Sequence, residues 1–212
     1  MIELDVQLTA DRRLVIFHDD RLDRTTNGRG RLDQQRYRDL ATLDAGSWYH
    51  PKFSSERILL VSQALRIVPA PHRINLELKR TRTPGALIDG LLRCVRWTRT
   101  MHRVLISSFD VGLIRHVARR QPRLPRAINC SQRALAALRH ATALACVALH
   151  PDRSLVTRRL VQQAHEAGLR VHVWTVDAPA EARRLLQWGV DGLFTNAPEK
   201  IAKVIRHARS AS

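Results

Sequence analysis

The chain has 212 residues, of which 44% are apolar and 26% are charged, a balance typical of one globular domain with a buried core. This composition argues against a disordered, fibrous or repeat protein. No apolar run reaches the roughly eighteen residues of a membrane span, and the charged opening segment does not resemble a signal peptide, so we expect a cytoplasmic protein. The three cysteines lack metal-ligand spacing and fit reduced thiols better than a disulfide framework.

Basic residues dominate the charge, with 36 Lys and Arg against 19 Asp and Glu and a formal net charge of +17. A nucleic-acid-binding protein would gather this charge in a tail or stripe with interleaved aromatic residues. Here the arginines are spread over the whole length, and aromatic residues make up only 5% of the chain. We therefore interpret the charge as an arginine bias of a solvated surface, with weak attraction to anionic lipid surfaces and no specific nucleic-acid partner.

Short strand-like runs alternate with longer segments of helical spacing, which predicts α/β units around a parallel sheet. The expected strands are, in chain order, 2–8, 14–18, 74–78, 104–107, 127–129, 146–149, 171–176 and 192–195. The expected helices are 85–99, 111–120, 131–140, 154–167, 180–188 and 198–209. Gly168 and Gly189 stand where a glycine commonly ends a helix.

The second expected strand differs from the others because only five residues separate Leu8 from Leu14. A parallel crossover needs about a dozen residues or more, so these two strands form an antiparallel hairpin. The hairpin returns His18 toward Glu3 and Asp5. Seven parallel strands then remain. This is one fewer than in the closed eight-stranded α/β barrel, which at about 250 residues is also longer than this chain.

The first expected strand carries two acidic residues, Glu3 and Asp5, on the face opposite its apolar residues. An edge strand with one solvated face would explain this pattern equally well. The pattern recurs in 74–79, where Glu77 and Lys79 lie opposite the apolar residues. In a barrel the inward face leads to the mouth, so Glu3, Asp5 and Glu77 can converge near the carboxyl ends of neighbouring strands. Three such carboxylates predict a site for Ca²⁺ or Mg²⁺, and the lack of a cysteine or histidine cluster argues against zinc.

Two further residues are candidates because of their position at strand ends. His18 follows an apolar run and precedes two aspartates, and a lone histidine in such a place is more often a surface or capping residue. The hairpin, however, places it near the carboxylates, where a general acid or base is useful. Trp174 ends a late strand and can line the mouth of a pocket, although a tryptophan there belongs to the core about as often.

Eight short segments carry a further pattern. They are 2–6 (Ile-Glu-Leu-Asp-Val), 15–19 (Val-Ile-Phe-His-Asp), 24–30 (Arg-Thr-Thr-Asn-Gly-Arg-Gly), 43–48 (Leu-Asp-Ala-Gly-Ser-Trp), 75–79 (Asn-Leu-Glu-Leu-Lys), 107–110 (Ser-Ser-Phe-Asp), 173–177 (Val-Trp-Thr-Val-Asp) and 189–196 (Gly-Val-Asp-Gly-Leu-Phe-Thr-Asn). Each segment alone is a weak signal. In this order and spacing, the set resembles the glycerophosphodiester phosphodiesterase family over nearly the whole chain.

The resemblance implies an α/β fold, the TIM-type (β/α)8 barrel, here missing its first β/α unit. It implies a single domain over residues 1–212, with an insertion at about 19–57. The implied reaction is metal-dependent hydrolysis of a glycerophosphodiester to glycerol 3-phosphate and an alcohol. The residues that match the family's site are Glu3, Asp5 and Glu77 for one divalent cation, Ca²⁺ or Mg²⁺, His18 for catalysis, and Lys79 and Trp174 for substrate binding.

The sequence also departs from the family pattern. Family members begin with a strand ending in His-Arg-Gly and a helix containing Glu-Asn-Thr, and this sequence begins after both. The partner histidine, an arginine that contacts phosphate and a glutamate near the metal therefore have no match. Smaller differences are Leu59-Leu60 in place of Pro-Thr, and Asn196 in place of aspartate.

Several interpretations stay open at this point. The chain can be a phosphodiesterase whose true start lies upstream of Met1, or a truncated homologue with impaired catalysis that still binds metal or ligand. Lysophospholipase D-type activity on lysophospholipids is a further alternative, and a basic nucleic-acid-binding protein has little beyond charge in its favour. We expect the 212 residues expressed alone to be aggregation-prone or marginally folded, because an incomplete barrel exposes unpaired strand edges.

Overall fold

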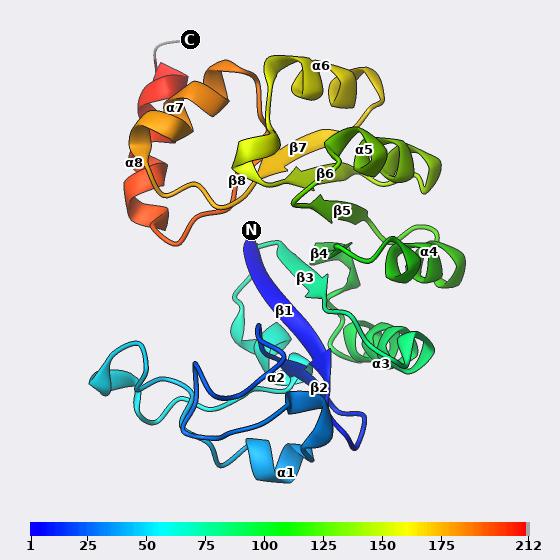
Figure 1. Ribbon diagram of the computed structural model, residues 1–212, viewed down its shortest axis with the longest axis vertical. Helices are drawn as coiled ribbons and strands as arrows, with labels where there is room; N and C mark the ends of the chain where they lie inside the picture. The colour runs from blue at the N-terminus through cyan, green and yellow to red at the C-terminus, as the bar shows by residue number, and fades with distance from the viewer. Residues whose placement is uncertain (211–212) are drawn as a thin grey trace. The chain divides into compact units, whose positions relative to one another are not determined.

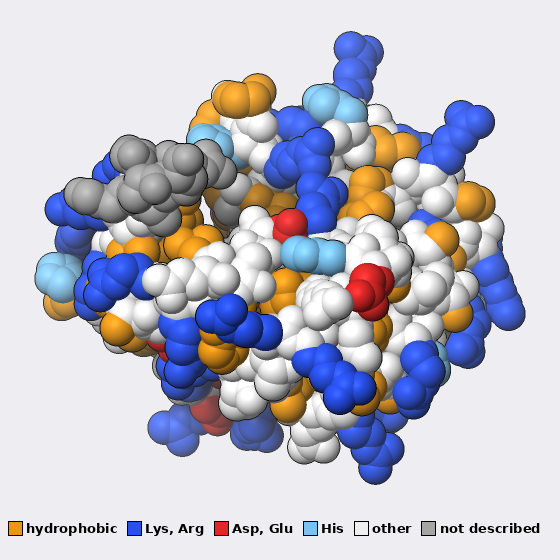
Figure 2. All heavy atoms as spheres, turned by 90° about the horizontal axis from the view of Figure 1, so that it is seen from above, with side chains coloured by type: hydrophobic (Ala, Val, Ile, Leu, Met, Phe, Trp, Pro, Cys, Tyr) orange, Lys and Arg blue, Asp and Glu red, His pale blue; other side chains and the backbone are white. Residues whose placement is uncertain are grey.

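The computed structural model describes the backbone of residues 1–210 and the side chains of residues 1–206. The chain divides into two compact units, Met1–Leu124 and Pro125–Ser212. The single domain expected over residues 1–212 therefore stays a prediction. Within the part of the chain described, no helix is both long enough and apolar enough to cross a membrane. Lys and Arg side chains are scattered over the face seen in Figure 2 and do not form one stripe.

The first unit is built on a sheet that contains the predicted hairpin (Figure 1). Strand β1 (Ile2–Leu8) pairs antiparallel with β2 (Leu14–Ile16) and parallel with β3 (Ile74–Leu78). Strand β4 (Val104–Ser108) continues the sheet in parallel with β3. The bounds of β1 and β3 are those expected from the alternation of apolar and polar residues. Strand β2 ends two residues earlier than expected, at Ile16.

Two long helices belong to the first unit. Helix α3 (Pro84–Trp97) begins with a proline, whose fixed φ suits the first helical turn. Helix α4 (Val111–Arg120) begins after Asp110, whose carboxylate accepts the Gly112 N–H at 2.8 Å. The sequence did not predict the short helices α1 (Tyr37–Leu40) and α2 (Val61–Ile67), or the 3₁₀ turns Leu32–Gln34, Pro51–Phe53 and Met101–Arg103.

The segment expected as an insertion, residues 19–57, packs around a small core of its own beside β2. The buried members of this core are Val15, Phe17, Leu22, Leu32, Leu40 and Ile58. Gly46 is enclosed so closely that a Cβ atom there would collide with the carbonyl oxygen of Phe53, so only glycine fits. Asp44 fixes the same turn, because its carboxylate accepts the N–H groups of Gly46 and Ser47, both at 2.9 Å.

The second unit consists of four strands and four helices in alternation (Figure 1). The strands are β5 (Arg126–Cys130), β6 (Ala148–Pro151), β7 (Arg170–Val173) and β8 (Gly192–Leu193), and consecutive ones pair in parallel. The helices are α5 (Ala134–Ala143), α6 (Arg158–Glu166), α7 (Pro179–Gln187) and α8 (Pro198–Ser210). Every β/α connection within the second unit therefore joins parallel neighbours, as expected, and in the first unit the β3–α3–β4 connection does the same.

Several boundaries in the second unit differ from those expected, for local reasons. Strand β6 starts at Ala148 and not at 146, because Ala145 adopts φ 48° and the Cys146 N–H still bonds to the α5 carbonyl of Ala141. Helix α6 starts after Thr157, whose hydroxyl caps it by accepting the Leu160 N–H at 3.1 Å. The predicted helix caps are confirmed, since Gly168 and Gly189 have φ values of 73° and 86°.

Candidate active site

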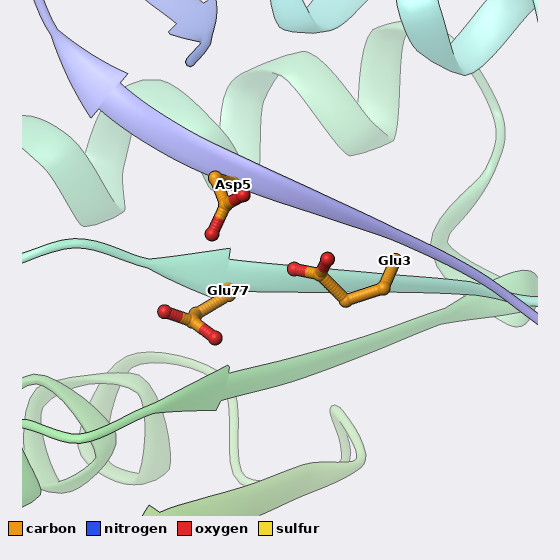
Figure 3. Close-up of side chains that lie close together, drawn as sticks. All are labelled: Glu3, Asp5 and Glu77. Carbon is orange, nitrogen blue, oxygen red and sulfur yellow. The ribbon is translucent and has the colours of Figure 1, made fainter. Parts of the chain in front are cut away.

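Three acidic side chains come together on neighbouring strands of the first unit. Glu3 and Asp5 extend from β1 and Glu77 from β3, on the same side of the sheet (Figure 3). The parallel register places Asp5 directly opposite Glu77. One carboxylate oxygen of each residue lies within 4.8 Å of the others. We call Glu3, Asp5 and Glu77 the carboxylate cluster; the structure brings together all three side chains that the strand pattern placed on one face.

The electrostatics of the carboxylate cluster are those of crowded, partly buried acids. Burial, together with the charges of Asp5 and Glu77, raises the pKa of Glu3 to about 8. Burial also raises the pKa of Glu77, against the opposing effect of Lys79. Among the described residues, Glu3 Oε1 is buried and accepts no hydrogen bond. An oxygen in this state is costly unless it is protonated or bound to a cation, so the cluster fits a hard divalent ion that takes oxygen ligands.

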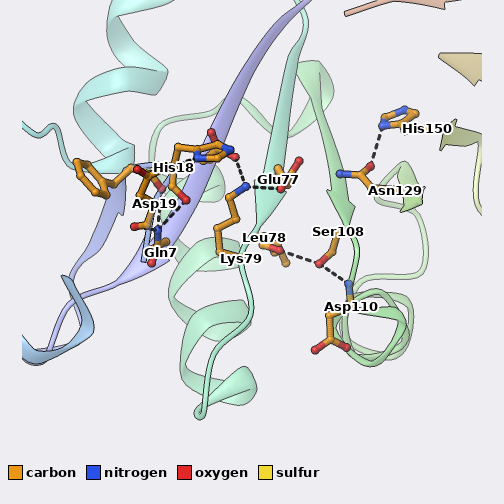
Figure 4. Close-up of polar contacts among 12 residues, drawn as sticks. Gln7, His18, Asp19, Glu77, Leu78, Lys79, Ser108, Asp110, Asn129 and His150 are labelled. Atoms are coloured by element: carbon orange, nitrogen blue, oxygen red, sulfur yellow. Dashed lines mark hydrogen bonds and ion pairs between the residues drawn. The ribbon is translucent and has the colours of Figure 1, made fainter. Parts of the chain in front are cut away.

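Lys79 follows β3 and ties two members of the cluster together. Its Nζ lies 2.7 Å from Asp5 Oδ1 and 2.6 Å from Glu77 Oε1 (Figure 4). Burial alone would lower the pKa of Lys79, but the two carboxylates outweigh that effect and raise it. The ammonium group is therefore charged and held at the cluster.

His18 lies just beyond β2, at the end of the hairpin arm. The Phe17 N–H donates to the Asp5 carbonyl oxygen at 3.0 Å, so the arm returns alongside β1 as expected. His18 is one of the groups that oppose the rise in the pKa of Glu77, so its imidazole lies within electrostatic reach of the cluster. Its Nδ1 donates to Asp19 Oδ1 at 2.6 Å, and its side chain is 66% exposed.

Gln7 is a site residue that the sequence did not point to. Its buried side chain carries an amide that lies 3.0 Å, 3.2 Å and 2.8 Å from the carbonyl oxygens of Phe17, His18 and Asp19. This amide holds the backbone on which the histidine stands (Figure 4). The available signal was the place of Gln7 on the same face of β1 as Glu3 and Asp5, and a buried glutamine there needs hydrogen-bond partners.

Trp174 belongs to the second unit, directly after β7. Its Nε1 donates to the His150 carbonyl oxygen at 2.8 Å. The residue lines an open pocket of about 580 Å³. The other lining residues are Asp152, Arg153, Thr175, Asp177, Ala178, Asn196 and Lys200.

A second polar group, which we call the histidine cluster, consists of Asn129, His150 and His172 on β5, β6 and β7. His150 Nδ1 lies 3.1 Å from Asn129 Oδ1, and His172 Nδ1 lies 3.1 Å from His150 Nε2. His150 is almost fully buried, and burial lowers its pKa well below the usual range. Burial likewise lowers the pKa of His172. Sequence reasoning assigned no role to either histidine, although both stand between apolar strand residues.

Comparison with known proteins agrees with the motifs. The model of the "Glycerophosphoryl diester phosphodiesterase family" matches residues 1–200. A glycerophosphodiester phosphodiesterase from Caldanaerobacter subterraneus subsp. tengcongensis is 31% identical over 208 residues, which cover 97% of this chain and 85% of that protein. One from Bacillus subtilis is 29% identical over 221 residues, with 96% and 75% covered.

Solved structures give the same result. A phosphodiesterase from Oleispira antarctica, in complex with the product sn-glycerol-3-phosphate, has a TM-score of 0.92 and 29% identity, and the match covers 96% of this chain and 84% of that one. A glycerophosphodiester phosphodiesterase from Thermotoga maritima, at 18% identity and a TM-score of 0.75, shares the fold, with 95% and 84% covered. The fold class is therefore α/β, of the TIM-type barrel. This chain belongs to the glycerophosphoryl diester phosphodiesterase family and is a phosphoric diester hydrolase.

Proposed function

We propose that this chain hydrolyses glycerophosphodiesters to glycerol 3-phosphate and an alcohol, with one divalent cation, Ca²⁺ or Mg²⁺, bound by Glu3, Asp5 and Glu77. The observation that carries this proposal is the buried Glu3 Oε1, which accepts no hydrogen bond among the described residues. Three carboxylates gathered within 4.8 Å otherwise repel one another. A cation removes that repulsion and supplies the missing partner.

Two positive groups act on the phosphate in this proposal. A cation held by Glu3, Asp5 and Glu77 would supply positive charge to stabilise the negative charge that develops on a phosphoryl oxygen. Lys79 supplies a second charge through Nζ, which its ion pairs with Asp5 and Glu77 hold in place. Because Lys79 is only 18% exposed, its charge is weakly screened by solvent.

His18 moves the proton. Its Nδ1–H is engaged by the Asp19 carboxylate, so Nε2 is the nitrogen left to exchange a proton with the attacking or leaving oxygen. Exposure of the ring gives substrate access to that nitrogen. Nε2 takes a proton from the attacking water and passes it to the leaving alkoxide, so the alcohol departs as a neutral molecule.

The substrate class is supported by the relatives. The Oleispira antarctica protein binds sn-glycerol-3-phosphate, the product expected here. Trp174, which lines a pocket within its own unit, is proposed as a substrate-binding residue. Lysophospholipids, which share the glycerophosphodiester bond, stay an alternative substrate class.

Turnover by a polypeptide of these 212 residues is expected to be impaired. The resemblance implies two catalytic histidines, and His18 matches one of them. The other has no match in these 212 residues. Loss of a general acid or base typically costs about 10² to 10⁴ in rate. Addition of an N-terminal strand ending in His-Arg-Gly is therefore expected to raise turnover.

The experiment measures cation binding and product separately. Thermal unfolding is followed with Ca²⁺, with Mg²⁺ and with chelator, and glycerol 3-phosphate release from glycerophosphocholine is assayed under the same conditions. We expect one of the ions to raise Tm in the parent chain and in Glu166→Gln, a control at an exposed position of α6, but not in Glu3→Gln. No ion-dependent change in the parent, or undiminished product formation in chelator, would contradict the proposal.

A further inference from the structure

We propose that Arg24 is a positioning residue that acts through Asp19 to hold the His18 imidazole in one orientation and one protonation pattern. The inference rests on the proposed role of His18 as the group that transfers a proton. Arg24 begins the segment Arg-Thr-Thr-Asn-Gly-Arg-Gly, to which the mechanism above gives no role.

The His18 ring needs something to orient it. Gln7 fixes the backbone of residues 17–19, but the side chain of His18 is 66% exposed, so packing does not restrict its rotation. Among the residues that the structure describes, the one hydrogen bond to its ring nitrogens joins Nδ1 to Asp19 Oδ1, at 2.6 Å. The position of the Asp19 carboxylate therefore sets the position of the ring.

Arg24 grips that carboxylate at both oxygens. Its Nε donates to Asp19 Oδ2 at 2.6 Å, and its Nη2 donates to Asp19 Oδ1 at 2.8 Å. Such a two-point contact fixes the plane of the carboxylate as well as its location. Asp19 Oδ1 thus receives two donors, Arg24 and His18, and the carboxylate cannot rotate without breaking both.

The same contact determines which histidine nitrogen carries the proton. The hydrogen bonds from Arg24 hold the pKa of Asp19 far below its usual range. An ionised carboxylate only accepts hydrogen bonds, so the proton between the two residues must sit on His18 Nδ1. Nε2 is then left free in the neutral imidazole, which is the nitrogen that the proposed function uses.

Arg24 is itself held by the insertion. Its guanidinium lies 5.6 Å from the centroid of the Trp48 ring, within the range of a cation–π contact. Trp48 is in turn fixed by a hydrogen bond from Nε1 to the Ala45 carbonyl oxygen at 2.9 Å. A continuous series of contacts therefore runs from the insertion to His18.

A neighbouring ion pair provides the matched comparison. Arg21 and Asp23 form a pair at 3.2 Å in the same loop, and both side chains are exposed. Exposed pairs of this kind contribute little to stability. Arg21→Gln therefore removes a similar charge from the same loop without a direct contact to the Asp19 carboxylate.

The test follows the imidazole nitrogens of His18 by ¹⁵N NMR in the 212-residue chain, with the signals assigned by their loss in His18→Gln. The parent and Arg21→Gln are expected to show a neutral imidazole protonated at Nδ1 alone. Arg24→Gln is expected to show a mixture of both tautomers. Arg24→Lys, which keeps the charge but not the two-point contact, should be intermediate. A single Nδ1–H form in Arg24→Gln, or the same mixture in Arg21→Gln, would overturn the proposal.

Turnover gives a second readout, measured in the chain extended by an N-terminal strand ending in His-Arg-Gly. Loss of orientation at a proton-transfer group is expected to lower kcat by about tenfold to a hundredfold with little change in KM. If Arg24→Gln does not fold, Asp19→Ala, which removes the acceptor of the His18 Nδ1–H, takes its place, and a single Nδ1–H form there also overturns the proposal. A fully active His18→Ala enzyme would instead disprove the proposed function and leave the tautomer result standing.

Discussion

The carboxylate cluster of the first unit and the histidine cluster of the second are both polar groups on parallel strands, yet they meet burial in opposite ways. In the histidine cluster the three side chains are joined by hydrogen bonds of 3.1 Å. In the carboxylate cluster, Glu3 Oε1 is buried without a partner among the described residues. Folding alone satisfies the first arrangement and not the second, so the unmet requirement points to a ligand at the carboxylate cluster.

Burial raises the pKa of acids in the carboxylate cluster and lowers the pKa of the histidines in the histidine cluster, for one physical reason. Removal from water disfavours any charged form, so the pKa of an acid rises and that of a histidine falls. The pKa of Glu3 rises to about 8, whereas that of His150 falls well below its usual range. Burial thus favours the neutral form of both Glu3 and His150, but only Glu3 would gain by becoming charged when a cation binds.

The largest expected effect is on the activity of Glu3→Gln. Removing one cation ligand should lower kcat/KM by about a thousandfold, if the ion supplies several kcal/mol of transition-state stabilisation. The same variant should be more stable than the parent in chelator at pH 8, because one of three repelling charges is gone. Calorimetry and product assays check the two halves, with Glu166→Gln as the control. Lower stability in chelator would show that the acids do not repel one another.

The next effect concerns His18→Ala, which should lower kcat by about 10² to 10⁴ through loss of proton transfer. Melting temperature should hardly move, because the ring is largely exposed. His72→Ala, at another exposed position of the first unit, is the matched control. Retention of full activity by His18→Ala would remove this residue from the mechanism.

Substitution in the histidine cluster should lower the free energy of unfolding. His150→Ala leaves a cavity and breaks the bonds to Asn129 and His172, so we expect a loss of about 2–4 kcal/mol in the free energy of unfolding. His140→Ala, at an exposed position of α5, should change it by less than about 0.5 kcal/mol. Denaturant unfolding measures both variants. A loss in His150→Ala as small as that of the control would mean that the cluster contributes no stability.

The smallest expected effect is an opposite pH dependence of the two clusters. The folded pKa of His150 lies below its unfolded value, so the unfolded chain binds more protons, and stability is lost as pH falls below about 6.5. The folded pKa of Glu3 lies above its unfolded value, so in chelator its contribution is present below pH 4.5 and is lost as pH rises through about 8. His150→Leu should remove the acid-side loss, and Glu3→Gln the alkaline one. Persistence of either slope in its variant would assign it to other groups.

The sequence predicted those parts of the fold that local patterns determine. Alternation placed Glu3, Asp5 and Glu77 on one face, because side chains in a strand point to opposite faces in turn. The five-residue spacing after Leu8 required the hairpin that brings His18 back. Helix α4 was predicted with its observed bounds, since its apolar spacing marks it clearly.

Other features depended on contacts between distant segments. Helix α2 has only seven residues, too few for a periodic pattern to stand out. The left-handed Ala145, which delays β6, has no signature in its residue type. The histidine cluster joins side chains from three strands, and the grip of Arg24 on Asp19 depends on how the loop folds. Such pairings are set by tertiary structure and cannot be read from spacing.

The enclosed turn at Gly46 links the packing of the insertion to the contacts that orient His18. One added methyl group there would meet the Phe53 carbonyl oxygen and force the backbone of residues 44–48 outward. Trp48, two residues further on, carries the ring that lies 5.6 Å from the Arg24 guanidinium. A substitution that alters no charge and removes no functional group could thus release the His18 imidazole from a distance. Tolerance to mutation in this protein is therefore set by freedom from steric conflict as much as by the identity of reactive side chains.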